Sequence, residues 1–313
     1  MLQILIILII CLITYIIIDN NIIRINRQKV NLTRTKHDKI KVLQISDLHN
    51  RKFCGRLAKK INSENADVIC FTGDMENDIS LIKNKNSFIN FIESLSKDVL
   101  MLYVDGNNGK KTMDINTLEL TSYGKVLERF GVKILKDFYI LENEKICFVN
   151  TDVCRYITNL NHKKGRKKLK RPDKIDFSKE NNTIYRENFI KKLNEYKEKY
   201  TIIGVGHYPF NLEQMYNVYK NKYNSLSFDL NLAGHYHGGQ FNLPLFGVIF
   251  VPSMNSKNEC YFPKKNEIQH LQTVGSVYQN ISKGLGSTNA DIIIPILAFR
   301  LFNTPEIDII EVD

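Results

Sequence analysis

A series of short apolar segments, each ending in a polar turn, constrains the fold of this 313-residue chain more than any other feature. Residues 39–46, 66–74 and 98–108 each begin with an apolar run of strand length. Helical spacing of apolar residues follows each run, and further strand-like segments continue from residue 132. This order predicts an α/β fold in which packed β-sheets are covered by helices.

The polar turns at the ends of these strands carry most of the chain's chemically active side chains. Sites in open α/β sheets form beyond the carboxyl ends of the strands, so successive strand ends deliver side chains to one edge. Four of the seven histidines lie in these turns. The turns are Asp47-Leu48-His49, Gly73-Asp74, Gly106-Asn107-Asn108, Gly206-His207 and Gly234-His235-Tyr236-His237-Gly238-Gly239.

Each turn alone has a structural explanation, because an Asp at a strand end often caps a helix and Gly-Asp is a common turn. His235 and His237 are more informative, since alternate residues of an extended segment face the same side. Together, the oxygen and imidazole donors suit divalent transition metals such as Mn, Fe or Zn. Seven ligands are too many for one tetrahedral ion and favour two ions about 3.5–4 Å apart that share a carboxylate. Such a pair activates a water molecule for phosphoryl transfer.

The ordered set D-x-H, G-D, G-N, G-H and G-H-x-H resembles the calcineurin-like metallophosphoesterase superfamily over residues 41–310. The segments GHYHGGQF, PLFG, GLG (284–286) and PEI (305–307) are similar to its membrane-associated bacterial branch, typified by the YkuE and YaeI phosphohydrolases. The resemblance implies a four-layer α/β sandwich, with two mixed β-sheets flanked by helices. It also implies a first metal held by Asp47, His49, Asp74 and His237, and a second held by Asp74, Asn107, His207 and His235.

One position departs from the family pattern, in which the Gly-Asn pair is usually followed by His. Asn108 stands there, and an amide donates a hydrogen bond but cannot deliver a proton near neutral pH. Loss of a general acid reduces the rate by about 10²–10⁴, and by less when the leaving group is a weak base. Asn108 therefore indicates either a substrate with a good leaving group or a slowed enzyme. Hydrolases of lipid-linked pyrophosphates resemble this pattern in lacking that His.

The leading functional hypothesis is a membrane-anchored, dinuclear-metal phosphohydrolase that cleaves phosphoester or pyrophosphate bonds, including those of lipid-linked substrates. A metal-bridging hydroxide would attack phosphorus, and the metals, His207 and His235 would neutralise the negative charge that develops on the phosphoryl group. Asn108 would occupy the position of the usual general acid. The alternative is a catalytically weakened, metal-binding regulator or scaffold at the membrane. A nuclease is disfavoured, because no aromatic residues interleave with the basic run at residues 163–174.

The N-terminal segment predicts a membrane anchor. Residues 4–18 carry no charge, which gives an apolar stretch near the roughly 17 residues that a membrane span requires. No basic residue precedes the stretch and no small-x-small cleavage site follows it, which disfavours a cleaved signal peptide; a buried helix is the other alternative. Basic residues follow the span, so the positive-inside rule places the catalytic domain in the cytoplasm of a single-pass protein. Cysteines without paired spacing agree with a reducing compartment.

Charge distribution completes the prediction of domains and partners. Of the net charge of +11, residues 24–41 contribute seven basic and one acidic residue, and residues 163–174 contribute eight and one. The rest of the chain carries 11 − 13 = −2. The predicted organisation is an anchor (1–20), a basic linker (21–39) and a metallophosphoesterase domain (40–313). The predicted partners are a phosphorylated small-molecule or lipid substrate and an anionic membrane surface.

Overall fold

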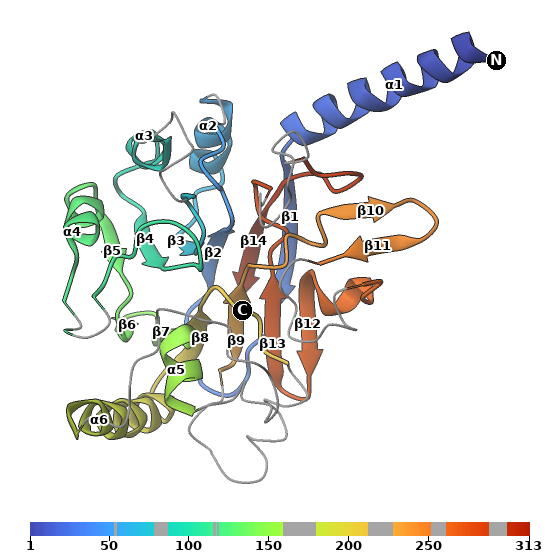
Figure 1. The fold of residues 1–313 in the computed structure, drawn as a ribbon. Helices are drawn as coiled ribbons and strands as arrows, with labels where there is room; N and C mark the ends of the chain where they lie inside the picture. Colours follow the sequence, from blue (N-terminus) through green and yellow to red (C-terminus); the bar gives the residue numbers. More distant parts are fainter. Residues whose placement is uncertain are drawn as a thin grey trace.

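Two six-stranded β-sheets form the body of the protein in a computed structural model, which describes residues 1–52, 55–77, 87–114, 117, 119–158, 180–211, 228–251, 261–287 and 299–313. The first sheet begins with a strand near the N-terminus and continues with the C-terminal strand (Figure 1). Its order is β1 (Arg24–Val30), β14 (Glu306–Val312), β2 (Ile40–Ile45), β3 (Val68–Thr72), β4 (Leu100–Val104) and β5 (Val132–Ile134).

The second sheet packs against the first, and a separate two-stranded hairpin extends beside it. The order of the second sheet is β12 (His270–Val274), β13 (Val277–Ile281), β9 (Leu230–Ala233), β8 (Thr201–Val205), β7 (Ile146–Asn150) and β6 (Phe138–Leu141). The hairpin joins β10 (Phe241–Leu243) to β11 (Gly247–Phe250), and a 3₁₀ turn covers Lys265–Glu267.

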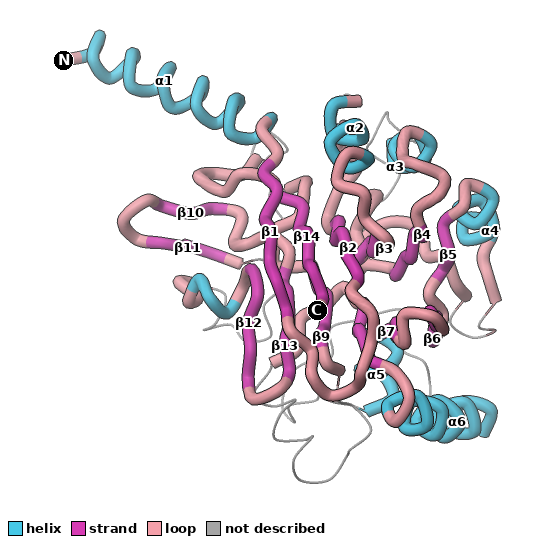
Figure 2. The backbone as a smooth tube through the Cα atoms, turned by 180° about the vertical axis from the view of Figure 1, so that it is seen from behind, coloured by secondary structure: helices cyan, strands magenta, loops and turns pink. Residues whose placement is uncertain are grey.

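Three apolar layers separate four layers of secondary structure. The first lies between the first sheet and the helices α2 (Arg56–Asn62), α3 (Ser87–Glu93) and α4 (Ser122–Arg129). The second lies between the sheets, and the third joins the second sheet to α5 (Thr151–Thr158) and α6 (Glu180–Lys197). Figure 2 shows the two groups of helices on opposite sides of the sheets. This arrangement confirms the predicted α/β fold with mixed sheets.

Strand direction explains why the predicted turns meet. Strands β2, β3 and β4 are parallel neighbours, as are β7, β8 and β9 in the other sheet. Their carboxyl ends therefore share one edge of the sandwich, where connections can reach across from sheet to sheet. On the outer face of the second sheet, Phe189 and Leu193 of α6 are buried.

The predicted linker at residues 21–39 is wrong over residues 24–30, because these residues form β1. Strand β1 pairs in parallel with β14, from Arg24 opposite Glu306 to Val30 opposite Val312. Two basic side chains of β1 are paired with acids of the body, Arg27 with Glu64 and Lys29 with Asp313, each at 2.6 Å. After the strand, Arg34 and Lys39 are paired in the same way with Asp229 and Asp313. The stretch after the apolar helix is therefore part of the domain. The basic run at residues 163–174 lies outside the described residues.

Helix α1 (Leu2–Asn21) is a long apolar helix whose last turn is attached to the body. It has 20 residues, a mean hydropathy of 2.7 in its most apolar window and almost wholly exposed side chains, so its length and composition suffice to cross a membrane. Its base is held by a two-way contact with Arg300: Asn20 Nδ2 donates to the Arg300 carbonyl at 2.7 Å, and the Arg300 amide donates to Asn20 Oδ1 at 2.9 Å.

Candidate metal centre

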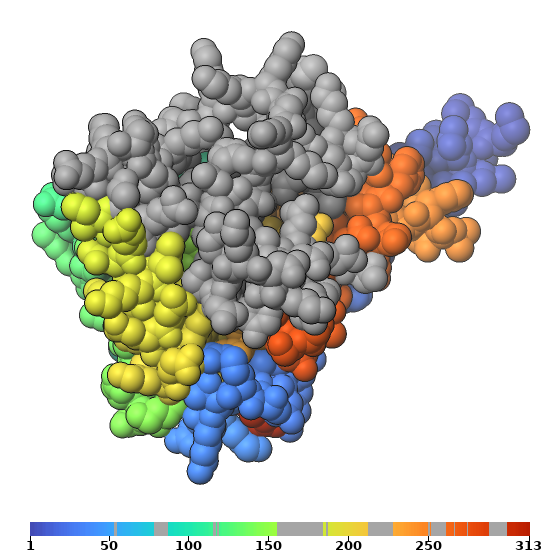
Figure 3. Space-filling view, turned by 90° about the horizontal axis from the view of Figure 1, so that it is seen from below, coloured from blue at the N-terminus to red at the C-terminus, as the bar shows by residue number. Residues whose placement is uncertain are grey.

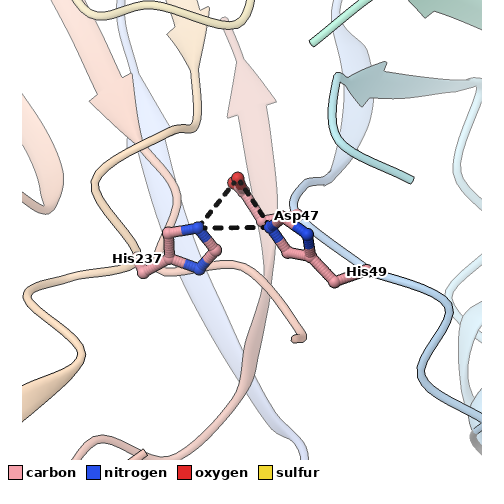
Figure 4. A group of neighbouring side chains, drawn as sticks. All are labelled: Asp47, His49 and His237. Atoms are coloured by element: carbon pink, nitrogen blue, oxygen red, sulfur yellow. Dashed lines mark hydrogen bonds and ion pairs between the residues drawn. The ribbon is translucent and has the colours of Figure 1, made fainter. Parts of the chain in front are cut away.

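The first group of candidate ligands contains Asp47 and His49, which follow β2, and His237, which follows β9 (Figure 4). The Nε2 atoms of the two imidazoles lie 3.3 Å apart. Asp47 Oδ1 is 3.4 Å from His237 Nε2 and 3.9 Å from His49 Nε2. All three side chains are almost fully buried. Three donor atoms from both sheets thus converge on one small volume.

The second group surrounds His207, which follows β8. Its Nε2 atom lies 2.8 Å from Asn107 Oδ1, 3.0 Å from His235 Nδ1 and 3.5 Å from Asp74 Oδ2. Asp74 Oδ2 is also 3.7 Å from His49 Nε2, so this carboxylate reaches both groups. The structure therefore brings together all seven side chains that the sequence predicts as ligands.

Hydrogen bonds on the far side of two rings fix which nitrogen faces the centre. The Thr72 carbonyl lies 2.9 Å from His207 Nδ1, so Nδ1 carries the proton and donates it. His49 Nδ1 likewise donates to Asn77 Oδ1, while the same amide's Nδ2 donates to the His49 carbonyl at 3.5 Å. Both Nε2 lone pairs consequently point into the centre, as metal-binding imidazoles require.

The donor set fits a cation, because acceptor atoms face one another across the centre. His207 Nε2 faces Asn107 Oδ1 and Asp74 Oδ2, and neither oxygen can donate a proton to it, so a metal ion or a proton on Nε2 must lie between them. Against the effect of burial, Asp74 and Asp47 accordingly raise the pKa of His207. Asp47 Oδ1 is buried and accepts no hydrogen bond within the described part of the chain. Buried carboxylates and facing acceptors are unfavourable unless positive charge lies between them.

The titration behaviour of these groups reflects the same demand for positive charge. Burial raises the pKa of Asp47, and the neighbouring Asp74 charge raises it further. Burial also opposes ionisation of Asp74, but His207, His49 and two hydrogen bonds from Asn108 outweigh it and hold the pKa of Asp74 well below its usual range. Burial and the nearby His49 lower the pKa of His237, which keeps its ring neutral and able to bind a metal.

Backbone conformation singles out the same residues. Eleven non-glycine residues of the described chain have positive φ, and five of them are candidate ligands: Asp47, His49, Asp74, His235 and His237. This conformation is uncommon for residues other than Gly, and each instance is unfavourable by about 1–3 kcal/mol. Such concentration is typical of a site whose surroundings impose side-chain directions. Gly106 allows the tight packing involved, because a Cβ there would lie 2.0 Å from Asp74 Oδ1.

Asn108 donates two hydrogen bonds to Asp74, one of the predicted metal ligands. Its backbone amide donates to Asp74 Oδ1 at 2.7 Å, and its Nδ2 donates to Asp74 Oδ2 at 2.6 Å. The side chain at the position of the usual acid therefore orients the central carboxylate. The loop that carries Asn107 and Asn108 is itself held by Asp105, whose carboxylate accepts from the Thr112 amide at 3.0 Å.

Sequence reasoning missed several residues that support the centre. Asn77 orients His49, and Asp152 accepts from the His207 backbone amide at 2.7 Å. Asp152 follows β7 as the predicted ligands follow their strands, so the strand-end pattern could have found it. Arg300 and Asn303 hold the carbonyl of His237 at 2.8 and 2.7 Å, and no local pattern marks that role.

Substitution of Asn77 tests its orienting role. We expect Asn77→Ala to weaken divalent metal binding by about 10–100-fold, because His49 loses the acceptor that fixes its tautomer. Asn77→Asp keeps an oxygen at that place and should retain most of the affinity. Titration of the metal-free protein with Mn²⁺ measures both; equal affinities for Asn77→Ala and the parent protein would show that the contact is structural only.

Comparisons with known proteins assign the family. The model of the calcineurin-like phosphoesterase family matches residues 40–239, so the chain belongs to that family. With the Asp and His groups described above, this membership makes it a metal-dependent phosphoesterase. A comparison with curated proteins finds no significant match.

Solved structures similar to this chain include enzymes and predicted enzymes of phosphoester chemistry. A phosphopantetheinyl hydrolase from Mycobacterium tuberculosis is 11% identical, with 77% of this chain and 88% of that chain covered and a TM-score of 0.39. A dimetal phosphatase from Danio rerio is 13% identical, with 79% and 88% covered and a TM-score of 0.37. A predicted phosphoesterase from Streptococcus pneumoniae is 9% identical, with 82% and 78% covered and a TM-score of 0.27.

Proposed function

We propose that the protein is a membrane-anchored phosphohydrolase that uses two divalent ions to cleave phosphodiester or pyrophosphate bonds with good leaving groups. The observation that carries the proposal is the position of Asn108, whose amide is held on Asp74 and cannot supply a proton. A substrate that expels a phosphate monoester needs no such proton, whereas a substrate that expels an alkoxide does.

The distances support the ligand assignment implied by the family resemblance. Asp74 lies near both His49 and His207 and could serve both metal positions. Asp47, His49 and His237 would hold one ion with it, and Asn107, His207 and His235 would hold the other. When bound, the ions polarise the phosphoryl oxygens and lower the pKa of a bound water. Mn, Fe and Zn all suit this mixture of oxygen and imidazole donors.

The chain's own side chains provide position and charge. The Thr72 carbonyl and the Asn77 amide hold two imidazoles in their binding tautomers. Asn108 holds both oxygens of Asp74, which fixes the plane of the proposed bridging carboxylate. His207 and His235, whose Nε2 and Nδ1 atoms lie 3.0 Å apart, would hold the second ion, and that ion would supply positive charge to the transferring phosphoryl group.

A series of aryl and alkyl phosphodiesters with graded leaving-group pKa tests this proposal. With the native chain, we expect the rate to fall steeply as the leaving group becomes more basic. Asn108→His should raise the rate for alkyl leaving groups by about 10²–10⁴ and change little for aryl ones, because it restores a proton donor. A native rate that is independent of leaving-group pKa would contradict the proposed role of Asn108.

The alternative function is a metal-binding regulator or scaffold with weakened catalysis, and its support is the absence of a proton donor at Asn108. The same experiment separates the two. Absence of native hydrolysis across the series, with activity created by Asn108→His, would identify a degraded enzyme. Native hydrolysis that is lost on removal of the metal would identify an enzyme.

Membrane attachment is the second part of the proposal. Twenty helical residues span about 30 Å, the thickness of a bilayer's hydrocarbon core. Basic residues follow the helix, which favours a cytoplasmic catalytic domain and access to lipid-linked phosphates. A signal sequence is the competing interpretation of the helix. The orientation is tested with Lys125→Cys, an exposed position of the catalytic domain, treated in intact cells with a thiol reagent that does not cross the membrane. Efficient labelling would contradict a cytoplasmic catalytic domain.

A further inference from the structure

Large exposed apolar side chains outside the N-terminal helix gather at one place. Apart from α1 and the adjoining Met1 and Ile22, the described residues contain five of them, and four lie on or beside the β10–β11 hairpin. Leu245 and Phe246 form its tip, with 92% and 74% of their surface exposed. Tyr261 and Phe262 lie beside β11, because the Phe262 amide donates to the Ile249 carbonyl at 2.9 Å.

The hairpin is firmly based, so its exposed tip is a defined feature. Val248 of β11 is buried in an apolar cluster with Tyr236, Val251, Ile268 and Ile281. Gly239 makes room for this contact, since a Cβ there would lie 2.1 Å from Val248 Cγ1. The apolar side chains at the tip are therefore presented outward while the base of the hairpin is packed into the domain.

The same short segment, residues 299–304, holds both the hairpin and the base of α1. The amide of Asn242 in β10 donates to the Leu301 carbonyl at 2.9 Å, and the Leu301 amide donates to the Gln240 carbonyl at 3.0 Å. On the other side, Arg300 exchanges hydrogen bonds with Asn20, and the ring of Phe302 lies 4.8 Å from that of Tyr15. These contacts fix the hairpin relative to α1.

Helix and hairpin project from the same side of the molecule. In Figure 1 both extend to the right of the sheets, and Figure 2 shows them together on the opposite side of the reversed view. The view from below in Figure 3 places the hairpin next to the helix. A bilayer crossed by α1 would therefore lie on the side toward which the β10–β11 hairpin extends.

The residues beside the hairpin have the composition of a membrane interface. Tyr261 and Phe262 are followed by Pro263 and two exposed lysines, Lys264 and Lys265. Aromatic rings favour the headgroup region, and lysines beside them attract anionic lipids. Leu245 and Phe246 are large apolar side chains of the kind that interfacial proteins bury between headgroups and acyl chains. This combination favours a lipid surface over a protein partner.

We propose that the β10–β11 hairpin is a second membrane contact, which inserts Leu245 and Phe246 into an anionic bilayer beside α1. The inference rests on the proposed membrane span. It also bears on the substrate, because the hairpin begins directly after the ligand loop. Leu245 lies eight residues after His237, so the two are separated by at most about 29 Å. The contact would hold the metal centre close to lipid headgroups and favour substrates embedded in the bilayer.

Single-tryptophan reporters test the contact, because the native chain contains no Trp. Three full-length variants, Phe246→Trp, Ile10→Trp on α1 and Ile184→Trp on α6, are reconstituted into vesicles of brominated phosphatidylcholine and phosphatidylglycerol. We expect Phe246→Trp and Ile10→Trp to show blue-shifted emission that is quenched several-fold more than that of Ile184→Trp. All three replaced side chains are exposed, so folding should be preserved.

The outcomes distinguish this contact from the span. Quenching of Ile10→Trp without quenching of Phe246→Trp would overturn the hairpin contact and leave the anchor intact. Absence of quenching at both positions would overturn both. A third outcome would also overturn the inference. If the emission of Phe246→Trp is blue-shifted but unquenched, and changes when the protein is diluted in the vesicles, the tip contacts another copy of the chain instead of lipid.

Discussion

Replacement of Asp74 by Asn should reduce phosphoesterase activity by more than about 10³-fold, the upper range for loss of a single group that stabilises transition-state charge. Asp74 is the carboxylate that approaches both His49 and His207, at 3.7 and 3.5 Å. The amide of Asn is neutral and offers one oxygen instead of two, so the charge that would join two cations is lost. Measurement of kcat/KM on an aryl phosphodiester with Mn²⁺ present gives the result.

The loss should not reflect unfolding. Asp47 and Asp74 are buried near each other, and the Asp74 charge helps to raise the pKa of Asp47. Removal of the Asp74 charge relieves this repulsion but also forfeits the interactions with His207, His49 and Asn108 that hold the pKa of Asp74 low. The two activities are therefore compared at a temperature at which circular dichroism shows both proteins to be folded. Asp67→Asn, at an exposed turn before β3, is the matched control and should keep full activity. Full activity of Asp74→Asn would contradict the role assigned to this carboxylate.

Replacement of Arg300 by Ala should lower the free energy of unfolding by at least about 4 kcal/mol, because each buried acceptor left unsatisfied contributes about 1–3 kcal/mol. The Arg300 guanidinium is fully buried, and its five N–H groups donate to five backbone carbonyls. Burial lowers its pKa to about 10, so it remains charged at neutral pH. The acceptors are the carbonyls of Asn303, Gly284, Gly286, His237 and Lys283.

Urea denaturation measures this effect against a surface arginine. Typical domains are stable by only about 5–15 kcal/mol, so Arg300→Ala should be poorly folded. Arg27→Ala removes an exposed ion pair with Glu64 and should change stability by about 0–1 kcal/mol, because water and salt screen such pairs. Equal denaturation midpoints for the two variants would show that the carbonyl cluster around Arg300 is not what holds these loops.

The candidate ligands could be predicted from sequence because their placement follows from local signals. Each lies directly after an apolar run, and parallel strands bring such positions to one edge without any knowledge of distant contacts. Asp47, Asp74 and Asn107 are examples from three consecutive strands of one sheet. His207 and His235 are examples from the other sheet, and the family's order of motifs identifies the set as one site.

Other features depend on contacts that no local pattern encodes. The sequence of β1 resembles a polar linker, because six of its seven residues are exposed or half-buried in the structure. Its place in the sheet comes from backbone pairing with β14, at the other end of the chain. Helix α5 begins at the residue directly after β7, so no turn sequence marks the boundary between strand and helix. Arg300 binds carbonyls from three different segments, so its role becomes visible only when the loops are assembled.

The count of divalent ions bound by the purified full-length chain tests the central claim most directly. Native mass spectrometry of metal-free protein after titration with Mn²⁺, Fe²⁺ or Zn²⁺ gives the stoichiometry without relying on a substrate. The proposed site predicts two ions per chain, with weakened binding of both in Asp74→Asn and of one in His237→Ala. Absence of bound ions, or binding that survives the loss of Asp74 and His237 together, would contradict it.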